Sequence, residues 1–174
     1  MTKPVINVAQ ATTHTGESGD CFAYSMTELA SALGAKAIGA NLTRVPPGKA
    51  AFPFHHHYAE EEHFFVLSGS GVLRHGEDIH PVTKNDYVVN LPGGPDRAHQ
   101  LINTGSEDLV YLAISTSAIP DVVGYPDSGK TGVRTAPYGE ENSRFLISNA
   151  SKDTAGYWEG ENGERVAQIV AHRR

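Results

Sequence analysis

Four residues have the types and spacing of ligands for a single metal ion. His55 and His57 are separated by one residue, Glu62 follows shortly after them, and His99 stands much later in the chain. Three imidazoles and one carboxylate form a mixed nitrogen and oxygen set, which suits a divalent first-row transition metal such as iron, manganese, nickel, zinc or copper. Calcium and magnesium prefer all-oxygen shells, so they fit this set poorly.

A β-strand would bring the first two histidines to the same ion. Successive side chains of a strand point to opposite faces, so His55 and His57 share one face while His56 points the other way. Residues 58–61 are expected to form a turn, after which Glu62 opens the next strand. This arrangement predicts two imidazoles and one carboxylate on the same side of a strand pair.

The surrounding sequence has the pattern of an all-β domain. Short β-favouring runs alternate with breaks rich in Gly, Pro, Asn and Asp, which is typical of sandwiches and barrels. His99 opens one of the later runs, so it must reach the other candidate ligands from a strand distant in sequence. The expected strands cover residues 37–45, 62–67, 71–75, 79–82, 87–91, 99–103 and 109–117.

The rest of the chain is expected to extend this one domain, because 174 residues suffice for a single well-packed core. Apolar residues within 25–33 recur at helical spacing, and Gly34 is placed to end a short helix there. Residues 144–147 and 166–171 have the composition of isolated strands. The expected division is an N-terminal arm over residues 1–36, a barrel core over 37–117 and a C-terminal extension over 118–174 that packs on the barrel.

Composition excludes several classes of function. The chain has 14 basic and 20 acidic residues, a formal net charge of -6, and no basic stripe of the kind that neutralises nucleic-acid phosphates. No run approaches the roughly 18 apolar residues of a membrane-spanning helix, and the first residues do not form a secretory signal. Cys21 is the only cysteine, so no intrachain disulfide forms. We expect a cytoplasmic protein without nucleic-acid or membrane partners.

The first group of candidate ligands lies in a longer spaced motif. Gly48 is followed by six residues, His55-x-His57, four residues, Glu62, six residues and Gly69. This motif resembles the first motif of the cupin superfamily, from which it departs by one additional residue after Gly48.

The second group resembles the other motif of that superfamily. Asp86 is followed by five residues, Pro92-Gly93-Gly94, four residues, His99, three residues and Asn103. The family has a glycine where Asp86 stands, and it has two residues fewer before the histidine. The insertion lies where the family places the mouth of its barrel.

The resemblance implies a fold, a cofactor and an assembly. The fold would be a double-stranded β-helix, or jelly roll, with N- and C-terminal extensions. One divalent transition metal (Fe, Mn, Zn or Ni) would be held by His55, His57, Glu62 and His99, and the protein would be a homodimer. The flanking segments Asn41–Arg44 and Tyr125–Asp127 are similar to those of small single-domain cupins of uncharacterised activity.

The candidate ligand set favours a metalloenzyme that acts on a small molecule. Four protein ligands leave one or two open positions on a five- or six-coordinate metal. With iron(II), dioxygen and a chelating substrate could share them, and we place a dioxygenase slightly ahead. With zinc, manganese or nickel, the same opening suits an isomerase or lyase of sugar-like substrates. A metal-dependent binding module without turnover is the alternative from another class, and a storage scaffold is the least favoured.

The sequence does not identify the catalytic acid or base. Each candidate outside the metal set is more often a packing residue; the candidates are Tyr24, Arg44, Tyr87, Tyr111 and Glu60. Glu60 and Glu61 are expected to be solvated turn residues, although either would replace Glu62 if the turn were one residue tighter. His56 and His63 are expected to face outward or toward a neighbouring sheet. Cys21 has no evident base beside it and is interpreted as a half-buried thiol without a catalytic role.

Overall fold

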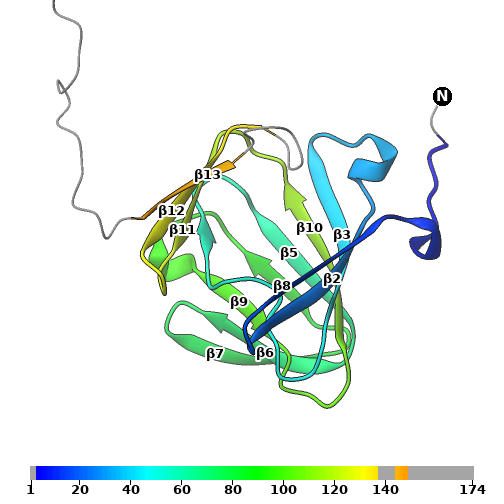
Figure 1. Cartoon of the computed structure of the whole chain (residues 1–174), viewed down its shortest axis with the longest axis horizontal. Helices are drawn as coiled ribbons and strands as arrows, with labels where there is room; N and C mark the ends of the chain where they lie inside the picture. The colour runs from blue at the N-terminus through cyan, green and yellow to red at the C-terminus, as the bar shows by residue number, and fades with distance from the viewer. Residues whose placement is uncertain (1–2, 137–143, 149–174) are drawn as a thin grey trace, which may run out of the picture.

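A computed structural model describes residues 3–136 and the backbone of residues 144–148, and these residues are almost entirely β-structure (Figure 1). They contain three short 3-10 helices, η1 (Val8–Gln10), η2 (Ser31–Leu33) and η3 (Pro95–Arg97). Their strands are β1 (Thr13–Ser18), β2 (Phe22–Glu28), β3 (Ile38–Val45), β4 (His56–His57), β5 (Glu62–Ser68), β6 (Ser70–His75), β7 (Asp78–Thr83), β8 (Tyr87–Asn90), β9 (His99–Ile102), β10 (Leu109–Thr116), β11 (Asp121–Tyr125), β12 (Lys130–Arg134) and β13 (Arg144–Ser148).

The strands form three antiparallel sheets that enclose one interior. The largest has the order β1-β2-β3-β10-β5-β8, and it faces a three-stranded sheet, β7-β6-β9, and a four-stranded sheet, β13-β12-β11-β4. Two isolated bridges, Ala50 with Ile102 and His55 with His99, join the segment before β4 to β9. The smaller sheets therefore act together as the second wall of a double-stranded β-helix, which confirms the expected all-β jelly roll.

The strands predicted for the barrel core are all present. Each of the seven, from β3 to β10 without β4, begins and ends within one residue of the predicted range. The strand predicted at 144–147 is found as β13, whereas the one predicted at 166–171 lies outside the described residues.

The helix predicted over residues 25–33 is wrong. Residues 25–28 belong to β2, which pairs with β1 on one side and with β3 on the other, and only Ser31–Leu33 form a short 3-10 helix, η2. Tyr24 on β2 packs against the core beside Phe52, with ring centroids 4.9 Å apart. Pairing and burial thus override the helical spacing of the apolar residues. Gly34 does end the short η2 turn, in the left-handed region at φ 82°.

The core fills the space between the two walls. Val45, Val66 and Leu109 are completely buried, and they pack with apolar side chains from both walls. Phe64 on β5 lies against Tyr111 on β10, with ring centroids 5.2 Å apart. This packing closes the interior below the candidate ligands and gives them an apolar floor.

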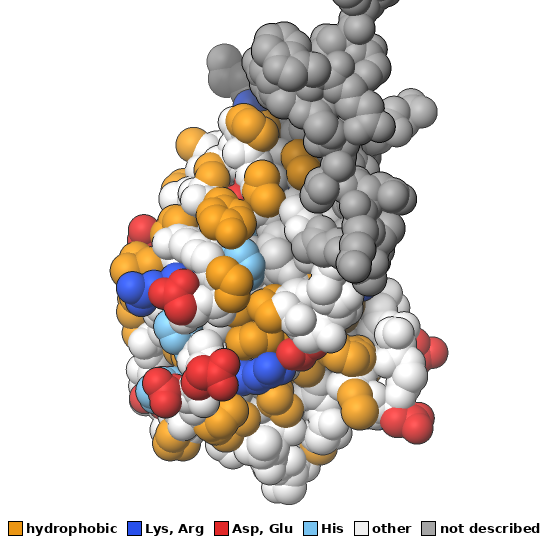
Figure 2. Space-filling view, turned by 90° about the vertical axis from the view of Figure 1, so that its left-hand side faces the viewer, with side chains coloured by type: hydrophobic (Ala, Val, Ile, Leu, Met, Phe, Trp, Pro, Cys, Tyr) orange, Lys and Arg blue, Asp and Glu red, His pale blue; other side chains and the backbone are white. Residues whose placement is uncertain are grey.

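The charged side chains on one face of the molecule are mixed in sign. On the face shown in Figure 2, acidic and basic side chains lie close together among apolar and uncharged ones, without a broad patch of one sign. None of the helices in the described part of the chain has the length and hydropathy needed to cross a bilayer.

Candidate metal centre

The four residues predicted as ligands converge on one point inside the barrel. Nε2 of His99 lies 2.8 Å from Oε2 of Glu62, and the Nε2 atoms of His55 and His57 each lie 3.6 Å from the same oxygen. The residues come from β4 and the position before it, from the start of β5 and from the start of β9. The fold therefore brings together donor atoms that are far apart in sequence.

Hydrogen bonds to backbone atoms fix the positions of His55 and His99, which lie opposite each other. The N–H of His99 donates to the carbonyl of His55 at 2.8 Å, and the N–H of His55 donates back at 3.2 Å. Nδ1 of His55 lies 2.8 Å from the carbonyl oxygen of Pro53, and Nδ1 of His99 lies 3.3 Å from that of Arg97. A carbonyl oxygen only accepts, so each Nδ1 is placed to donate, and in the neutral tautomer with its hydrogen on Nδ1 the Nε2 lone pair faces the interior.

Electrostatics keep this donor set close to the charge state that a metal requires. Burial raises the pKa of Glu62, but its close contacts with His55 and His99 and the nearby His57 outweigh burial and hold that pKa well below its ordinary value. Burial lowers the pKa of His99 despite its contact with the Glu62 carboxylate at 2.8 Å. At neutral pH the pair therefore favours an ionised carboxylate beside a neutral imidazole.

The third histidine is held by a residue that the sequence analysis missed. Nδ1 of His57 lies 2.5 Å from Oδ2 of Asp121, the first residue of β11, and Oδ1 of Asp121 accepts the N–H of Ala59 at 3.0 Å. Burial alone lowers the pKa of His57, but Asp121, Glu62 and Glu60 together raise it above the ordinary value of 6.5. The only sequence signal for Asp121 is an acidic residue opening an apolar strand.

A buried ion pair lies behind this contact. Glu60 is 4% exposed and Arg134 on β12 is 2% exposed, and the Arg134 guanidinium donates to Oε1 of Glu60. Burial raises the pKa of Glu60 to about 7, although Arg134 acts in the opposite direction. The expectation that Glu60 is solvated is therefore wrong: the turn folds inward because Arg134, far along the chain, supplies the opposite charge.

Glu60, Asp121 and Nδ1 of His57 also lie close enough together to hold a metal ion. Their polar atoms are already committed, however. Asp121 accepts from His57 and from the backbone, and Glu60 carries the guanidinium of Arg134, whose positive charge opposes a second cation. We therefore interpret this group as support for the first cluster.

Asn90 was also missed by the sequence analysis. It lies on β8 directly opposite Glu62 in the register of β5 and β8, so the two side chains share the inner face. Asn90 is 1% exposed, and neither its amide nitrogen nor its amide oxygen has a hydrogen-bond partner among the residues that the structure describes. A buried amide of this kind in a native protein calls for a ligand, ion or water as its partner.

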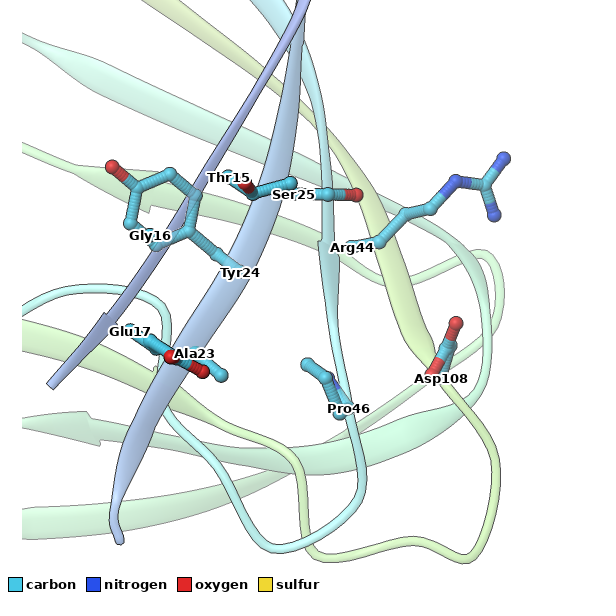
Figure 3. Close-up of a pocket in the computed structure, with 9 residues that line it drawn as sticks. All are labelled: Thr15, Gly16, Glu17, Ala23, Tyr24, Ser25, Arg44, Pro46 and Asp108. Carbon is cyan, nitrogen blue, oxygen red and sulfur yellow. The ribbon is translucent and has the colours of Figure 1, made fainter. Parts of the chain in front are cut away.

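Apart from Glu60, described above, the acid and base candidates lie away from the converging nitrogens. Tyr111 lies in the core below them, where burial raises its pKa. Tyr87 lies on the outer face of the large sheet. Tyr24 and Arg44 line an open groove of about 430 Å³ along β1, β2 and β3, where their side chains extend in opposite directions (Figure 3).

The remaining predicted residues lie as follows. His56 is buried, with Nδ1 2.8 Å from the carbonyl oxygen of Gly93, so it faces the loop before η3 and neither points outward nor contacts a neighbouring sheet through this hydrogen bond. Glu61 and His63 are partly exposed and hydrogen bond to each other on the outer side of β5. Cys21 is exposed, not half-buried.

One side of the metal cluster is open to solvent. The side chains of His55 and Glu62 keep 15% and 20% of their surface exposed, whereas those of His57 and His99 are buried. Tyr125 at the end of β11 stacks beside His55, with ring centroids 6.2 Å apart, and Nζ of Lys130 lies 5.6 Å from the Tyr125 ring. A small molecule would therefore approach from the side of His55 and Glu62.

Comparison with known sequences identifies the barrel. A sequence model of the cupin domain matches residues 41–115. The chain is also similar to an oxalate-binding protein of Thermotoga maritima, with 33% identity over 72 residues, which are 41% of this chain and 55% of that protein. The match thus spans about half the length of this curated relative.

Solved structures share the fold over a larger part of the chain. A protein of Acidithiobacillus ferrooxidans, described provisionally as a sugar phosphate isomerase, is 33% identical with a TM-score of 0.65, over 74% of this chain and 78% of that one. A sugar phosphate isomerase of the cupin superfamily from Silicibacter pomeroyi is 21% identical with a TM-score of 0.74, over 85% and 94%. A predicted oxalate decarboxylase of Thermotoga maritima is 25% identical with a TM-score of 0.55, over 64% and 97%. With these matches and this fold, the chain belongs to the cupin superfamily.

Proposed function

We propose that His55, His57, Glu62 and His99 bind one divalent transition metal, and that the protein is a metal-dependent enzyme acting on a small, oxygen-rich molecule. The observation that carries the proposal is the convergence of three imidazole nitrogens on one carboxylate oxygen. If each Nδ1 carries the hydrogen, all four converging atoms are acceptors. Acceptors do not gather at 2.8 to 3.6 Å unless a cation lies among them, either protons or a metal ion.

The chemistry of the set fits a metal better than a cluster of protons. Three neutral imidazoles and one carboxylate suit iron, manganese, zinc or nickel. When bound, such an ion would polarise a carbonyl or hold two oxygens of a substrate at its open positions. The exposed edge formed by His55 and Glu62 supplies the access that a substrate needs, and the apolar floor keeps water from the opposite side.

In this proposal the side-chain amide of Asn90 orients the substrate by hydrogen bonding to it. Its amide lies on the inner face beside Glu62 and offers both a donor and an acceptor that no atom in the described part of the chain uses. A hydroxyl or carboxylate oxygen next to the one held by the metal would satisfy it. Leaving such an amide unpaired costs about 1–3 kcal/mol, so a ligand that pairs with it gains a corresponding advantage.

Within this class we propose isomerisation or decarboxylation of a sugar-like or small carboxylate substrate. Support comes from the similar proteins, which are described as sugar phosphate isomerases, an oxalate-binding protein and a predicted oxalate decarboxylase. None of those descriptions involves dioxygen, so the dioxygenase, ahead on the sequence alone, becomes the second candidate. The dioxygenase stays a candidate because the ligand set itself accommodates iron.

The test begins with metal analysis of protein made without an affinity tag. We expect about one transition metal per chain after loading with iron, manganese, zinc or nickel, and turnover of aldose or ketose phosphates or of oxalate without oxygen uptake. Oxygen consumption by the iron form with a chelating substrate would establish the dioxygenase instead. Ligand-induced thermal stabilisation without turnover would establish a binding module. Failure to load any of these metals would overturn the proposal.

The homodimer implied by the family resemblance belongs to this proposal as well. Tyr87, Val89 and Leu91 alternate along β8 and its end, and all three are exposed on the outer face of the large sheet. A second copy of the chain would cover them. Sedimentation equilibrium of the wild type and of a Val89→Lys variant tests this, with a monomer in both as the contradicting result.

A further inference from the structure

We propose that Asp121 is a positioning residue that fixes His57 in the only tautomer able to bind the metal, and that Arg134 and Glu60 hold Asp121 in place. The inference rests on the proposed function, because it assigns a role toward the same ion. It also assigns the strands β11 and β12, which lie beyond the matched cupin domain at residues 41–115, to the metal centre.

The two oxygens of Asp121 have separate partners. Oδ1 accepts the backbone N–H of Ala59, and Oδ2 accepts from Nδ1 of His57. An ionised carboxylate has no hydrogen to give, so Nδ1 must carry it. A neutral imidazole has only one N–H, which leaves the lone pair on Nε2, the atom that faces Glu62.

His57 differs in this respect from the other two histidines. The tautomers of His55 and His99 are set by carbonyl oxygens of Pro53 and Arg97, each two residues away in sequence. At His57 the same task falls to a side chain 64 residues further along the chain. The orientation of this one ligand therefore depends on docking of the C-terminal strands.

The fold holds Asp121 through both of its neighbours. β11 pairs with β4, with Val123 opposite His57, which fixes the distance between the two strands. In the register of β11 and β12, Arg134 lies directly opposite Asp121. Arg134 donates to the carbonyl of Ala118 at 2.9 Å and pairs with Glu60, so it links the start of β11 to the turn that contains Ala59.

The substitution Asp121→Asn tests the tautomer at constant size. The amide must keep its oxygen on the N–H of Ala59, which places its NH₂ group against Nδ1 of His57. The NH₂ group donates, so the imidazole must accept at Nδ1 and carry its hydrogen on Nε2, where it blocks the metal. We expect metal affinity to fall roughly 10- to 100-fold, the usual cost of losing such an outer partner.

The first readout uses metal-free protein, so it does not depend on activity or on any ion. Nitrogen-15 NMR of His57 at about pH 9, well above the ordinary histidine pKa of about 6.5, should show Nδ1–H in the wild type and Nε2–H in Asp121→Asn. The second readout is the dissociation constant for cobalt(II), measured by its visible absorption. Asp127→Asn is the matched control: this carboxylate follows β11 but pairs with Arg74 at the surface, so neither readout should change.

The outcomes separate the role of Asp121 from the proposed binding of a metal. An Nε2–H tautomer in the wild type, or an unchanged tautomer and cobalt affinity in Asp121→Asn, would overturn the role of Asp121. The wild-type NMR result decides even if the variant does not fold. A wild type with the expected tautomer that binds no cobalt would contradict the proposed function while leaving the positioning of His57 intact.

Discussion

The two faces of β5 carry the same kinds of side chain in opposite arrangements. On the outer face, Glu61 hydrogen bonds to Nε2 of His63 at 2.7 Å, and Nδ1 of His63 lies 2.8 Å from the hydroxyl of Tyr87. This is a linear chain in which each group satisfies the next at the surface. On the inner face, three imidazoles point at one oxygen of Glu62. Convergence of acceptor atoms, rather than the number of histidines, is what marks a candidate cation site.

Removal of an inner ligand should have the largest effect. His99→Ala or Glu62→Ala deletes one of four donors, so metal affinity should fall by more than the roughly 100-fold that the loss of an outer partner costs. Metal content after gel filtration measures this, and circular dichroism should show that the barrel persists. Unchanged loading in both variants would remove the ligand assignment.

Replacement of the buried Arg134, which pairs with Glu60, should have the next largest effect. Above the Glu60 pKa of about 7, Arg134→Ala leaves a buried, ionised carboxylate without this partner, which typically costs about 3–5 kcal/mol of unfolding free energy. Asp127→Ala breaks the surface pair with Arg74 and should cost about 1 kcal/mol or less. Urea unfolding of the chelator-treated proteins measures both. Equal costs would contradict the distinction between the buried and the surface pair.

Acid should release the metal from the inner cluster. An imidazole binds metal only when neutral, and the pKa of His57 is raised above 6.5, so protons begin to compete above that pH. Affinity should then fall about tenfold per pH unit for each ligand that takes up a proton. His99, whose pKa is lowered, joins only at lower pH. Chelator competition between pH 8 and pH 5 checks this, and a constant affinity would contradict it.

Replacement of Asn90 should separate stability from function. Asn90→Leu exchanges an unpaired buried amide for an apolar group of similar size, which is expected to change the unfolding free energy by less than about 1 kcal/mol or to increase it. The KM for substrate should rise about fivefold, because a hydrogen bond worth about 1 kcal/mol is lost. Steady-state kinetics and thermal unfolding measure the two effects, and a destabilised variant with normal KM would point to a purely structural role.

The outer cluster should give the smallest effect. His63→Ala breaks a partly exposed chain of hydrogen bonds, so stability should change by no more than about 0.5 kcal/mol. Metal content should equal that of the wild type. A variant that loses its metal would show that His63 takes part in the centre, and the contrast between the two faces of β5 would fail.

Local patterns in the sequence predicted much of this fold and most of the candidate site. Alternation and turn residues placed the core strands to within one residue, because both signals lie within a few positions of each strand. The motif spacing named His55, His57, Glu62 and His99, which the fold brings together. Residues 25–33 failed because helical spacing of apolar side chains also occurs in a short strand whose neighbours β1 and β3 decide its conformation.

The residues that support the site could not be found in the same way. Asp121 and Arg134 act on His57 and Glu60 from more than 60 positions away, and no local pattern records that pairing. Glu60 resembled a solvated turn residue for the same reason. Asn90 looked like the polar end of a strand, and only the register with Glu62 gives it a role.

Anomalous diffraction from crystals soaked in a transition metal tests the central claim most directly. Data collected above and below the absorption edge of the loaded metal locate the ion without any assumption about ligands. We predict one strong peak per chain within bonding distance of His55, His57, Glu62 and His99. A fully soaked crystal with no peak there, or with its strongest peak elsewhere in the barrel, would contradict the account.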